Sequence, residues 1–396
     1  MSIIQAPATA RTATPRRLRL GMVGGGDGAF IGAVHRIAAR LDDCYEVVAG
    51  ALSSNAERAA ASGAAIRLAP ERIYSDYAEM ARTEAAREDG IDVVAIVTPN
   101  HLHAPVATAF LEAGIHVICD KPLGISLAEG LALAELARAN NRVFALTHTY
   151  TGYPLIRHAR EMVARGDIGE IRLVHVEYAQ DWMAEADKQS AAFQSTNWHN
   201  DPKFAGPTGC TGDIGTHAYH LAGFVTGIAP NELLAELHSF SPKRILDDHV
   251  QIMLRYPNGA RGMLWASQMA TGCENALKLR VFGTRASLSF DQENPNELWL
   301  TPQGGSAQRI TRGRVAGAAA QAATRIPSGH PEGYLEAFAQ LYRDAAAQIH
   351  AVNAWEPLPE ATLSLPTVAD GVAGMRFIEA VLESDRGGSR WVTVDK

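Results

Sequence analysis

Lys121 lies in an Asp-Lys-Pro turn directly after a mostly apolar run at residues 115–119. Four or five apolar residues bounded by turn residues are typical of a strand buried on both faces. Ligands of open parallel sheets bind at the carboxyl ends of such strands, and an ammonium group there stabilises negative charge on a reacting oxygen. Lys121 is therefore a candidate catalytic residue, with a plain surface lysine in a turn as the alternative.

A second candidate group lies in the stretch GPTGCTGDIGTHAYH, residues 206–220. In a helix that begins near residue 210, Asp213, His217 and His220 stand at i, i+4 and i+7 along one face. A carboxylate one turn from an imidazole orients the ring and holds its tautomer, as a general base requires. Two alternatives stay open: Asp213 caps the helix while the histidines pack or face solvent, or these residues bind zinc, with Cys210 as a further ligand.

The elements that would position these groups begin with a strand at residues 19–23 and a glycine-rich turn. Glycines between a strand and a helix let backbone N–H groups approach a pyrophosphate. Gly32 comes three residues later than the standard GxGxxG spacing would place it, so the turn alone does not exclude a purely structural role. The candidate cofactor residues here are Gly24, Gly26, Asp27, Gly28, Ala29, Phe30 and Ile31.

The segment 91–124 predicts a parallel βαβ unit with a right-handed crossover, because two buried strands flank a helix of about three turns. The turn after its first strand and the turn that holds Lys121 then lie at the same sheet edge. His101 either faces the nicotinamide or begins the helix. The candidate cofactor residues of this unit are Thr98, Pro99, Asn100, His103, Asp120, Lys121 and Pro122.

The strand at residues 46–52 should end where a carboxylate commonly binds the adenosine ribose. The sequence has Ser53 and Ser54 there instead, followed by Arg58. No acid repels a 2′-phosphate and Arg58 could pair with one, while the serines could equally bind the free hydroxyl of NAD. Arg58 as a solvated charge on a helix is a further alternative. The choice between NAD and NADP stays open.

The size of the chain, 396 residues, favours two domains, and its 47% hydrophobic and 20% charged residues are typical of a globular protein. A net charge of −7 argues against a nucleic-acid partner. No apolar run is long enough for a membrane helix, and residues 1–16 are expected to be disordered without being a secretory signal. Four scattered cysteines favour a reducing cytoplasm and no structural zinc.

The character of the sequence changes near residue 149. Residues 17–149 predict an N-terminal Rossmann dinucleotide-binding domain, and residues 150–396 an α/β domain for substrate binding and oligomerisation. Six alternating or β-branched runs between residues 170 and 290 predict a large, mostly antiparallel open sheet. Residues 302–328 look like a long surface loop, and helices should follow at 333–350 and 370–384. An exposed sheet face favours a homodimer or homotetramer.

Four aromatic residues are candidate substrate contacts: two tyrosines lie at the expected domain junction, and two tryptophans in the long excursion at residues 180–208 could stack on the apolar face of a sugar. Aromatic side chains are also ordinary core residues, so packing is the alternative for each. His330 precedes a helix and would either reach the cleft or cap that helix. These candidates are Tyr150, Tyr153, Trp182, Trp198 and His330.

The combination of a glycine-rich turn, TPNHLH, DKP and GDIGTH, in this order, resembles the Gfo/Idh/MocA oxidoreductases, which include inositol and sugar dehydrogenases and glucose–fructose oxidoreductase. The resemblance spans residues 19 to about 394. It implies a Rossmann domain followed by an α/β domain, with Lys121, Asp213 and His217 as the catalytic trio and a cis peptide before Pro122. The stretch that contains Arg58 resembles the NADP-binding segment of glucose–fructose oxidoreductase. Gln180 and Trp182, in QDW, resemble a strand end of levoglucosan dehydrogenase and similar sugar oxidisers.

The expected activity is NAD(P)-dependent oxidation of a secondary alcohol in a cyclic polyol, sugar or sugar derivative. His217 or Lys121 would take the hydroxyl proton, and the lysine ammonium would stabilise the alkoxide. Substrate contacts would come from Lys121, Asp213 and His217 together with the candidates above. The alternatives are a relative that cleaves glycosides by transient oxidation and a non-catalytic nucleotide- or sugar-sensing regulator.

Overall fold

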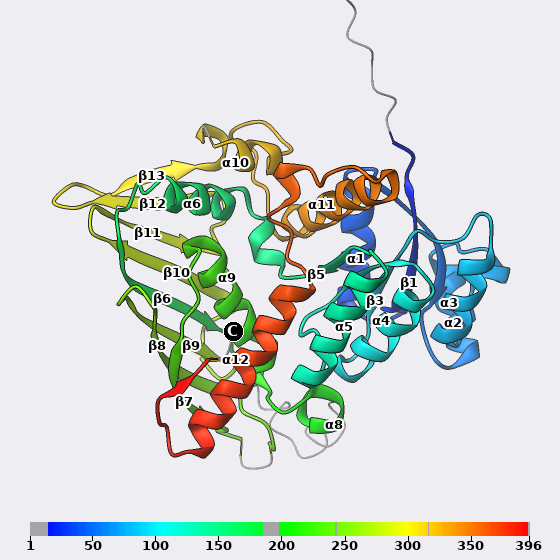
Figure 1. Cartoon of the computed structure of the whole chain (residues 1–396), viewed down its shortest axis with the longest axis horizontal. Coiled ribbons are helices and arrows are strands. Elements are labelled where there is room, and N and C mark those ends of the chain that lie inside the picture. Colours follow the sequence, from blue (N-terminus) through cyan, green and yellow to red (C-terminus); the bar gives the residue numbers. More distant parts are fainter. Residues whose placement is uncertain (1–14, 185–197, 242–243, 316, 395–396) are drawn as a thin grey trace, which may run out of the picture.

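The computed structural model describes residues 15–184, 198–241, 244–315 and 317–394. Its elements form two sheets that lie side by side, with helices between and around them (Figure 1). Of the stretch expected to be disordered, only residues 15 and 16 are described, and the Arg16 guanidinium pairs with Asp92, with Nη2 2.6 Å from Oδ1. Within the described residues no helix is long and apolar enough to cross a bilayer.

The first sheet has five parallel strands in the order β2-β1-β3-β4-β5. The central strand β3 is apolar and wholly buried, as expected where helices cover both faces of a sheet. The strands are β1 Leu18–Gly24, β2 Tyr45–Ala51, β3 Val93–Val97, β4 His116–Cys119 and β5 Phe144–Leu146. The helices that connect them are α1 Phe30–Leu41, α2 Ala56–Ala65, α3 Tyr77–Ala86, α4 His103–Glu112 and α5 Leu127–Ala139.

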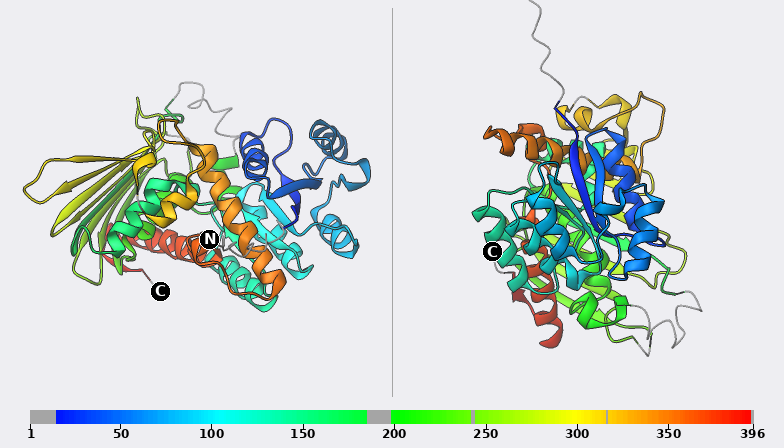
Figure 2. Two further views of the ribbon diagram at one scale, coloured as in Figure 1. Left: turned by 90° about the horizontal axis from the view of Figure 1, so that it is seen from above. Right: turned by 90° about the vertical axis from the view of Figure 1, so that its right-hand side faces the viewer.

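The second sheet has nine strands in the order β13-β12-β11-β10-β6-β9-β8-β7-β14, all antiparallel except the β6–β9 pair. Helices α6 Pro154–Ala164, α9 Thr216–Thr226 and α12 Val368–Arg386 lie on one face only (Figure 2). The strands are β6 Ile171–Ala179, β7 Glu232–His238, β8 His249–Arg255, β9 Arg261–Ser267, β10 Ala276–Gly283, β11 Ala286–Asp291, β12 Glu297–Pro302, β13 Gln308–Thr311 and β14 Val392–Thr393. The predicted fold, a Rossmann sheet followed by a large, mostly antiparallel open sheet, is confirmed.

Helix α11, Tyr334–Ala354, follows the second sheet in the sequence but returns to the first sheet and packs on α1. Its residues Phe338 and Tyr342 share a core with Leu20 and Val93, and the Tyr342 hydroxyl lies 2.7 Å from Nδ1 of His35. A helix from the second half of the chain therefore completes the packing of the first sheet. The domain boundary near residue 149 stays a prediction.

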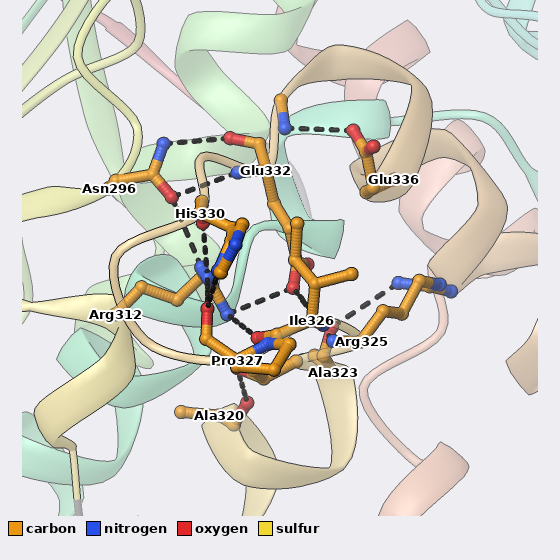
Figure 3. A network of polar contacts seen from close by, with 12 residues as sticks. Asn296, Arg312, Ala320, Ala323, Arg325, Ile326, Pro327, His330, Glu332 and Glu336 are labelled. Atoms are coloured by element: carbon orange, nitrogen blue, oxygen red, sulfur yellow. Dashed lines mark hydrogen bonds and ion pairs between the residues drawn. The ribbon is translucent and has the colours of Figure 1, made fainter.

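Residues 302–328 are not one long loop, because they include β13 and α10, Ala318–Ala323. The buried Arg312 guanidinium pairs with Glu332 at 2.9 Å and donates to backbone carbonyls, including that of His330 at 2.6 Å (Figure 3). Arg325 from the same segment pairs with Asp42 at the end of α1. This network fixes the path of the chain into α11 and joins it to the first sheet.

A second buried ion pair joins α6 to α11. Nη2 of Arg157 lies 2.5 Å from Oδ2 of Asp344, and the two side chains are 1% and 5% exposed. Gln340 donates to the other carboxylate oxygen at 2.8 Å. Burial raises the pKa of Asp344 even though Arg157 opposes this effect. Burying the Arg157 and Asp344 charges therefore costs free energy, and each charge is tolerated in the core only because the other is beside it.

We predict that Arg157→Met lowers the free energy of unfolding by about 3–5 kcal/mol, because it leaves a buried carboxylate unpaired. The loss should shrink as the pH falls and Asp344 becomes protonated. Adding Asp344→Leu should restore most of the stability. Urea unfolding followed by circular dichroism measures both effects, and Arg138→Met, which breaks only the exposed pair with Glu135, is the control. A double variant no more stable than Arg157→Met would contradict the prediction.

Candidate active site

Side chains from both sheets line a cleft of about 730 Å³ at the carboxyl ends of β3, β4 and β5. An adjoining groove of about 560 Å³ runs along the glycine-rich turn, and Ile31, Thr98 and Trp198 line both cavities. The sequence-predicted residues that line the cleft are Phe30, Ile31, Thr98, Asn100, His103, Asp120, Lys121, Tyr150, Gln180, Trp182, Trp198, Asp213 and His217. Those that line the groove are Gly24, Gly26, Asp27, Ala29, Ile31, Ser53, Ser54, Arg58, Thr98, Pro99 and Trp198.

The centre of the cleft is an ion pair between the two halves of the chain. Nζ of Lys121 lies 2.6 Å from Oδ1 of Asp213 and 2.7 Å from the Asp213 backbone carbonyl oxygen. Gln268 donates to the other carboxylate oxygen at 2.8 Å. Burial would raise the pKa of Asp213, but Lys121 and then His199 lower it to about 2. Asp213 is therefore a carboxylate that fixes the lysine ammonium in place.

The expected coupling of Asp213 to His217 is wrong in its geometry. Thr211–Gly215 forms a π-helical turn before α9, which widens the spacing that an α-helix would give. The carboxylate bonds to Lys121 and Gln268, and within the described residues Nδ1 of His217 has no hydrogen-bond partner. The π-helical turn thus assigns Asp213 to the lysine instead of the imidazole.

His217 instead lies among aromatic rings. Its ring centroid is 4.9 Å from that of Tyr150, 6.3 Å from that of Tyr178 and 5.4 Å from that of His148, all edge-on. Burial and then the Lys121 ammonium lower the pKa of His217 well below its ordinary value. His217 is therefore a neutral imidazole near pH 7, able to accept a proton.

Hydrogen bonds from neighbouring segments fix the Asp-Lys-Pro turn in place. The Lys121–Pro122 peptide bond is cis, as the family resemblance implies. The His103 ring bridges two turns, because Nδ1 lies 2.6 Å from the Pro122 carbonyl oxygen and Nε2 2.9 Å from that of Thr98. Asp120 accepts hydrogen bonds from Thr147 at 2.6 Å and from His35 at 3.0 Å. Burial would raise the pKa of Asp120, but His35 lowers it to about 2.

The far wall of the cleft carries groups that the sequence did not single out. The Asn275 side-chain oxygen accepts hydrogen bonds from Gln180 and from the Tyr178 hydroxyl, both at 2.7 Å. The His199 ring stacks on Trp198 at 3.6 Å. His199, Asn275, Gln268 and Tyr334 are single residues on separate segments and belong to no recognisable motif. Only their place in the fold identifies them.

Some predicted site residues lie elsewhere. Tyr153 is 2% exposed and donates to Gln292 in the core, so it is not a substrate contact. The His330 side chain is exposed in a turn, with Nδ1 3.4 Å from the Pro327 carbonyl oxygen, so it neither reaches the cleft nor caps α11 (Figure 3). Gly28 and Pro122 shape their turns without lining either cavity.

The zinc alternative finds no support in the structure. His220 pairs with Asp370, and the described residues hold no cluster of three or more His, Cys, Asp or Glu placed to bind a metal.

The groove fits a dinucleotide at the turn between β1 and α1. Gly24, Gly25 and Gly28 have φ of +79°, +67° and +80°, so the enlarged turn needs glycine. Helix α1 begins at Phe30, and neither a side-chain cap from the N-cap residue Ala29 nor an acid in the first turn is present, which leaves backbone N–H groups open to an anion. A Cβ on Gly32 would lie 2.2 Å from the Gly25 carbonyl oxygen. Gly32 therefore provides the close contact between helix and turn despite its late position.

We predict that Gly32→Ala weakens binding of reduced nicotinamide dinucleotide by at least about tenfold, because the added methyl group must displace the turn that faces the phosphates. Fluorescence titration measures the affinity. Gly374→Ala, whose Cβ meets nothing within 4 Å on α12, is the matched control and should bind normally. Equal affinity in both variants would contradict the role given to Gly32.

Comparison with known proteins agrees with this architecture. The model "Oxidoreductase family, NAD-binding Rossmann fold" matches residues 18–148, and "GFO/IDH/MocA C-terminal domain" matches residues 156–289. The solved oxidoreductase from Sinorhizobium meliloti is 49% identical, with a TM-score of 0.86 over 96% of this chain and 100% of that chain.

Two relatives have named ligands or activities. An inositol dehydrogenase homologue from Azotobacter vinelandii, solved with NADH and myo-inositol, is 36% identical, with a TM-score of 0.88 over 96% of this chain and 98% of that chain. Levoglucosan dehydrogenase of Pseudarthrobacter phenanthrenivorans is 30% identical over 74% of this chain and 78% of its own length. The chain therefore belongs to the Gfo/Idh/MocA family of NAD-binding oxidoreductases.

Proposed function

We propose that this oxidoreductase is an NAD(P)-dependent dehydrogenase that acts on a secondary alcohol of a cyclic polyol, sugar or sugar derivative. The observation that carries the proposal is the meeting of a lysine ammonium and a neutral imidazole in one cleft beside the dinucleotide groove. The relatives solved with NADH and myo-inositol or levoglucosan support this substrate class.

The proposed chemistry assigns one role to each charged or polar group. Lys121 donates two hydrogen bonds to Asp213, and its third N–H is left for the alcohol oxygen. His217 accepts the hydroxyl proton, while the ammonium stabilises the alkoxide as it forms. The nicotinamide, when bound, supplies the hydride acceptor. Gln180 and Tyr150 contact the substrate hydroxyl groups, and Trp182 and Trp198 stack on its apolar face.

Gln180 has a defined role in this proposal. Its side-chain nitrogen donates to Asn275 at 2.7 Å, which fixes the orientation of the amide. The Gln180 side-chain oxygen then remains to accept a hydrogen bond from a substrate hydroxyl. The side of the cleft formed by Gln180 and Asn275 therefore favours a polyhydroxylated ligand over a purely apolar alcohol.

The assembly proposed is a homodimer or homotetramer formed through the open face of the second sheet. Four apolar side chains on that face are 41–56% exposed, and such a surface is typical of an interface; they are Leu173, Met253, Met263 and Trp299.

The four cysteines form no disulfide bonds, which supports a place for the protein in the reducing cytoplasm.

We predict that the protein reduces NAD or NADP with at least one member of a panel of inositols and pyranoses, measured by the absorbance of the reduced nicotinamide. Lys121→Met and His217→Asn should each lower kcat by about 10²–10⁴-fold. Lys278→Met and His330→Asn are the matched controls, since their side chains lie away from the cleft. Turnover of a glycoside without net reduction would instead support transient oxidation, and no turnover at all would support a sensing role.

We predict that Arg58→Ala weakens binding of NADPH by about tenfold, near 1.4 kcal/mol, and leaves binding of NADH within about twofold. The reason is that Arg58 lines the groove beside Ser53 and Ser54, where a 2′-phosphate would need a cation. Fluorescence titration with both cofactors measures the ratio, with Arg82→Ala as a surface control. An equal loss of affinity for NADPH and NADH would contradict the role of Arg58 in binding the 2′-phosphate.

A further inference from the structure

The charged side chains that line the cleft do not balance. Among the described residues of the lining, Lys121 supplies the single ammonium group, and three carboxylates accompany it. These belong to Asp120, Asp213 and Glu274. The ammonium is already paired with Asp213 at 2.6 Å. Asp120 and Glu274 then remain as negative charges, and the described lining offers no further lysine and no arginine. A bound oxidised nicotinamide adds one positive charge and still leaves the lining acidic.

The histidines of the cleft add no positive charge near pH 7. Burial lowers the pKa of His103 and of His199, and it lowers the pKa of His217 well below the ordinary value. Arg244, on the loop between β7 and β8, is 7% exposed and lines a separate cavity of about 20 Å³. That space holds about one water molecule and is too small for a carboxylate or a phosphate group. An anionic substituent therefore meets no unpaired cation in the described part of the cleft.

The far wall of the cleft offers acceptors more than donors; it comprises Tyr150, Tyr178, Gln180 and Asn275. The Tyr178 hydroxyl donates its one proton to the Asn275 side-chain oxygen at 2.7 Å. In the short contact between the two hydroxyls, Tyr150 is therefore the donor, and both protons are used inside the protein. Gln180 donates one amide N–H to Asn275, and its oxygen is left as an acceptor. Only the second N–H groups of two neutral amides remain as donors.

Glu274 extends this acceptor surface to the rim of the cleft. It precedes Asn275 in the turn between β9 and β10, is exposed to solvent and lines the cleft. Two further carboxylates hold the same turn. Asp181 accepts a hydrogen bond from the Gly272 backbone N–H and Glu293 accepts one from the Asn275 backbone N–H, both at 2.9 Å. The turn therefore gathers negative charge at the rim, and Glu274 is the member that a ligand in the cleft meets.

We propose that the cleft selects its substrate by charge: a neutral polyol or sugar, or its amino derivative, binds, a sugar acid or sugar phosphate is rejected, and Glu274 contributes to this choice at the rim. The inference rests on the proposed function in taking the cleft as the substrate site. Hydroxyl and ammonium groups bring protons for the acceptors of the far wall. A carboxylate or phosphate group places lone pairs against lone pairs, leaves both unpaired and adds negative charge to an acidic lining.

The test uses two sets of ligands that share a ring and differ in charge. One set is glucose, glucosamine and glucuronate, and the other is myo-inositol, an inosamine and an inositol monophosphate. With the full-length protein, the absorbance of reduced nicotinamide gives kcat/KM, and isothermal titration calorimetry gives the affinity of each ligand for the NADH complex. Glucuronamide, which matches glucuronate in size without its charge, separates charge from shape.

The anionic member of each set should have a kcat/KM and an affinity at least about tenfold below those of the neutral member. Glucuronamide should behave as a neutral ligand, and the amino member should bind at least as tightly as the neutral one. Raising sodium chloride from about 0.05 M to about 0.5 M should narrow the difference between glucuronamide and glucuronate, because salt screens the exposed part of the charge.

Glu274→Gln keeps the size of the side chain and removes its charge. It should narrow the preference for glucuronamide over glucuronate, and lower the preference for the amino members, by about threefold each, since an exposed charge is partly screened. Glu274→Lys should narrow the first preference further. Glu356→Gln, exposed beyond α11 and lining neither the cleft nor the groove, is the matched control and should keep both ratios. Circular dichroism verifies that the variants are folded.

Equal or tighter binding of the anionic members overturns the inference, as do ratios that move no more in Glu274→Gln than in Glu356→Gln. If the ligands bind in the expected order and none is oxidised, the proposed function fails and the inference on charge stands. If neutral and anionic members are oxidised equally well, the inference fails and the function stands. If no member of either set binds, both fail.

Discussion

The ion pair between Lys121 and Asp213 is the interaction on which the site depends. The lysine follows a strand of the first sheet, and the aspartate belongs to the π-helical turn before α9, so the pair joins the two halves of the chain. Breaking a partly buried pair on one side leaves the other charge poorly solvated. The pair therefore links the two sheets inside the cleft, at the point where the proposed alcohol substrate would bind, and it holds the ammonium beside Asp213.

Each member of the pair has its own support. On the lysine side, His103 ties the Asp-Lys-Pro turn to Thr98. On the aspartate side, Gln268 donates to the carboxylate and in turn accepts a hydrogen bond from Arg244 at 3.2 Å. Asn100 adds a link across the cleft, because its amide donates to the Ala205 carbonyl oxygen at 2.8 Å. Such supporting groups matter because catalytic geometry tolerates displacements of only about half an ångström.

The sequence predicts the parts of the site that local patterns determine. Buried strands and the turns after them place Thr98, Asn100 and Lys121 at one sheet edge, and glycines with positive φ mark the dinucleotide turn. The coupling of Asp213 to His217 is wrong because helical spacing assumes 3.6 residues per turn, and the π-helical turn departs from it. Gln268, His199 and Asn275 come from segments whose approach only the tertiary fold determines. Tyr153, at the domain junction, and His330, before α11, fail for the related reason that position in the sequence does not fix side-chain direction.

The same ion pair explains why two basic groups in one cleft adopt different protonation states. The Lys121 ammonium is paired with Asp213, and it disfavours a second positive charge on His217. The Asp213 carboxylate bonds to Lys121 and Gln268, and within the described residues Nδ1 of His217 has no hydrogen-bond partner. A lysine and a histidine so arranged are an acid and a base at the same pH, which is the pair that alcohol oxidation requires. The π-helical turn, by moving one carboxylate from the imidazole to the ammonium, is thus a chemical feature of the site as well as a structural one.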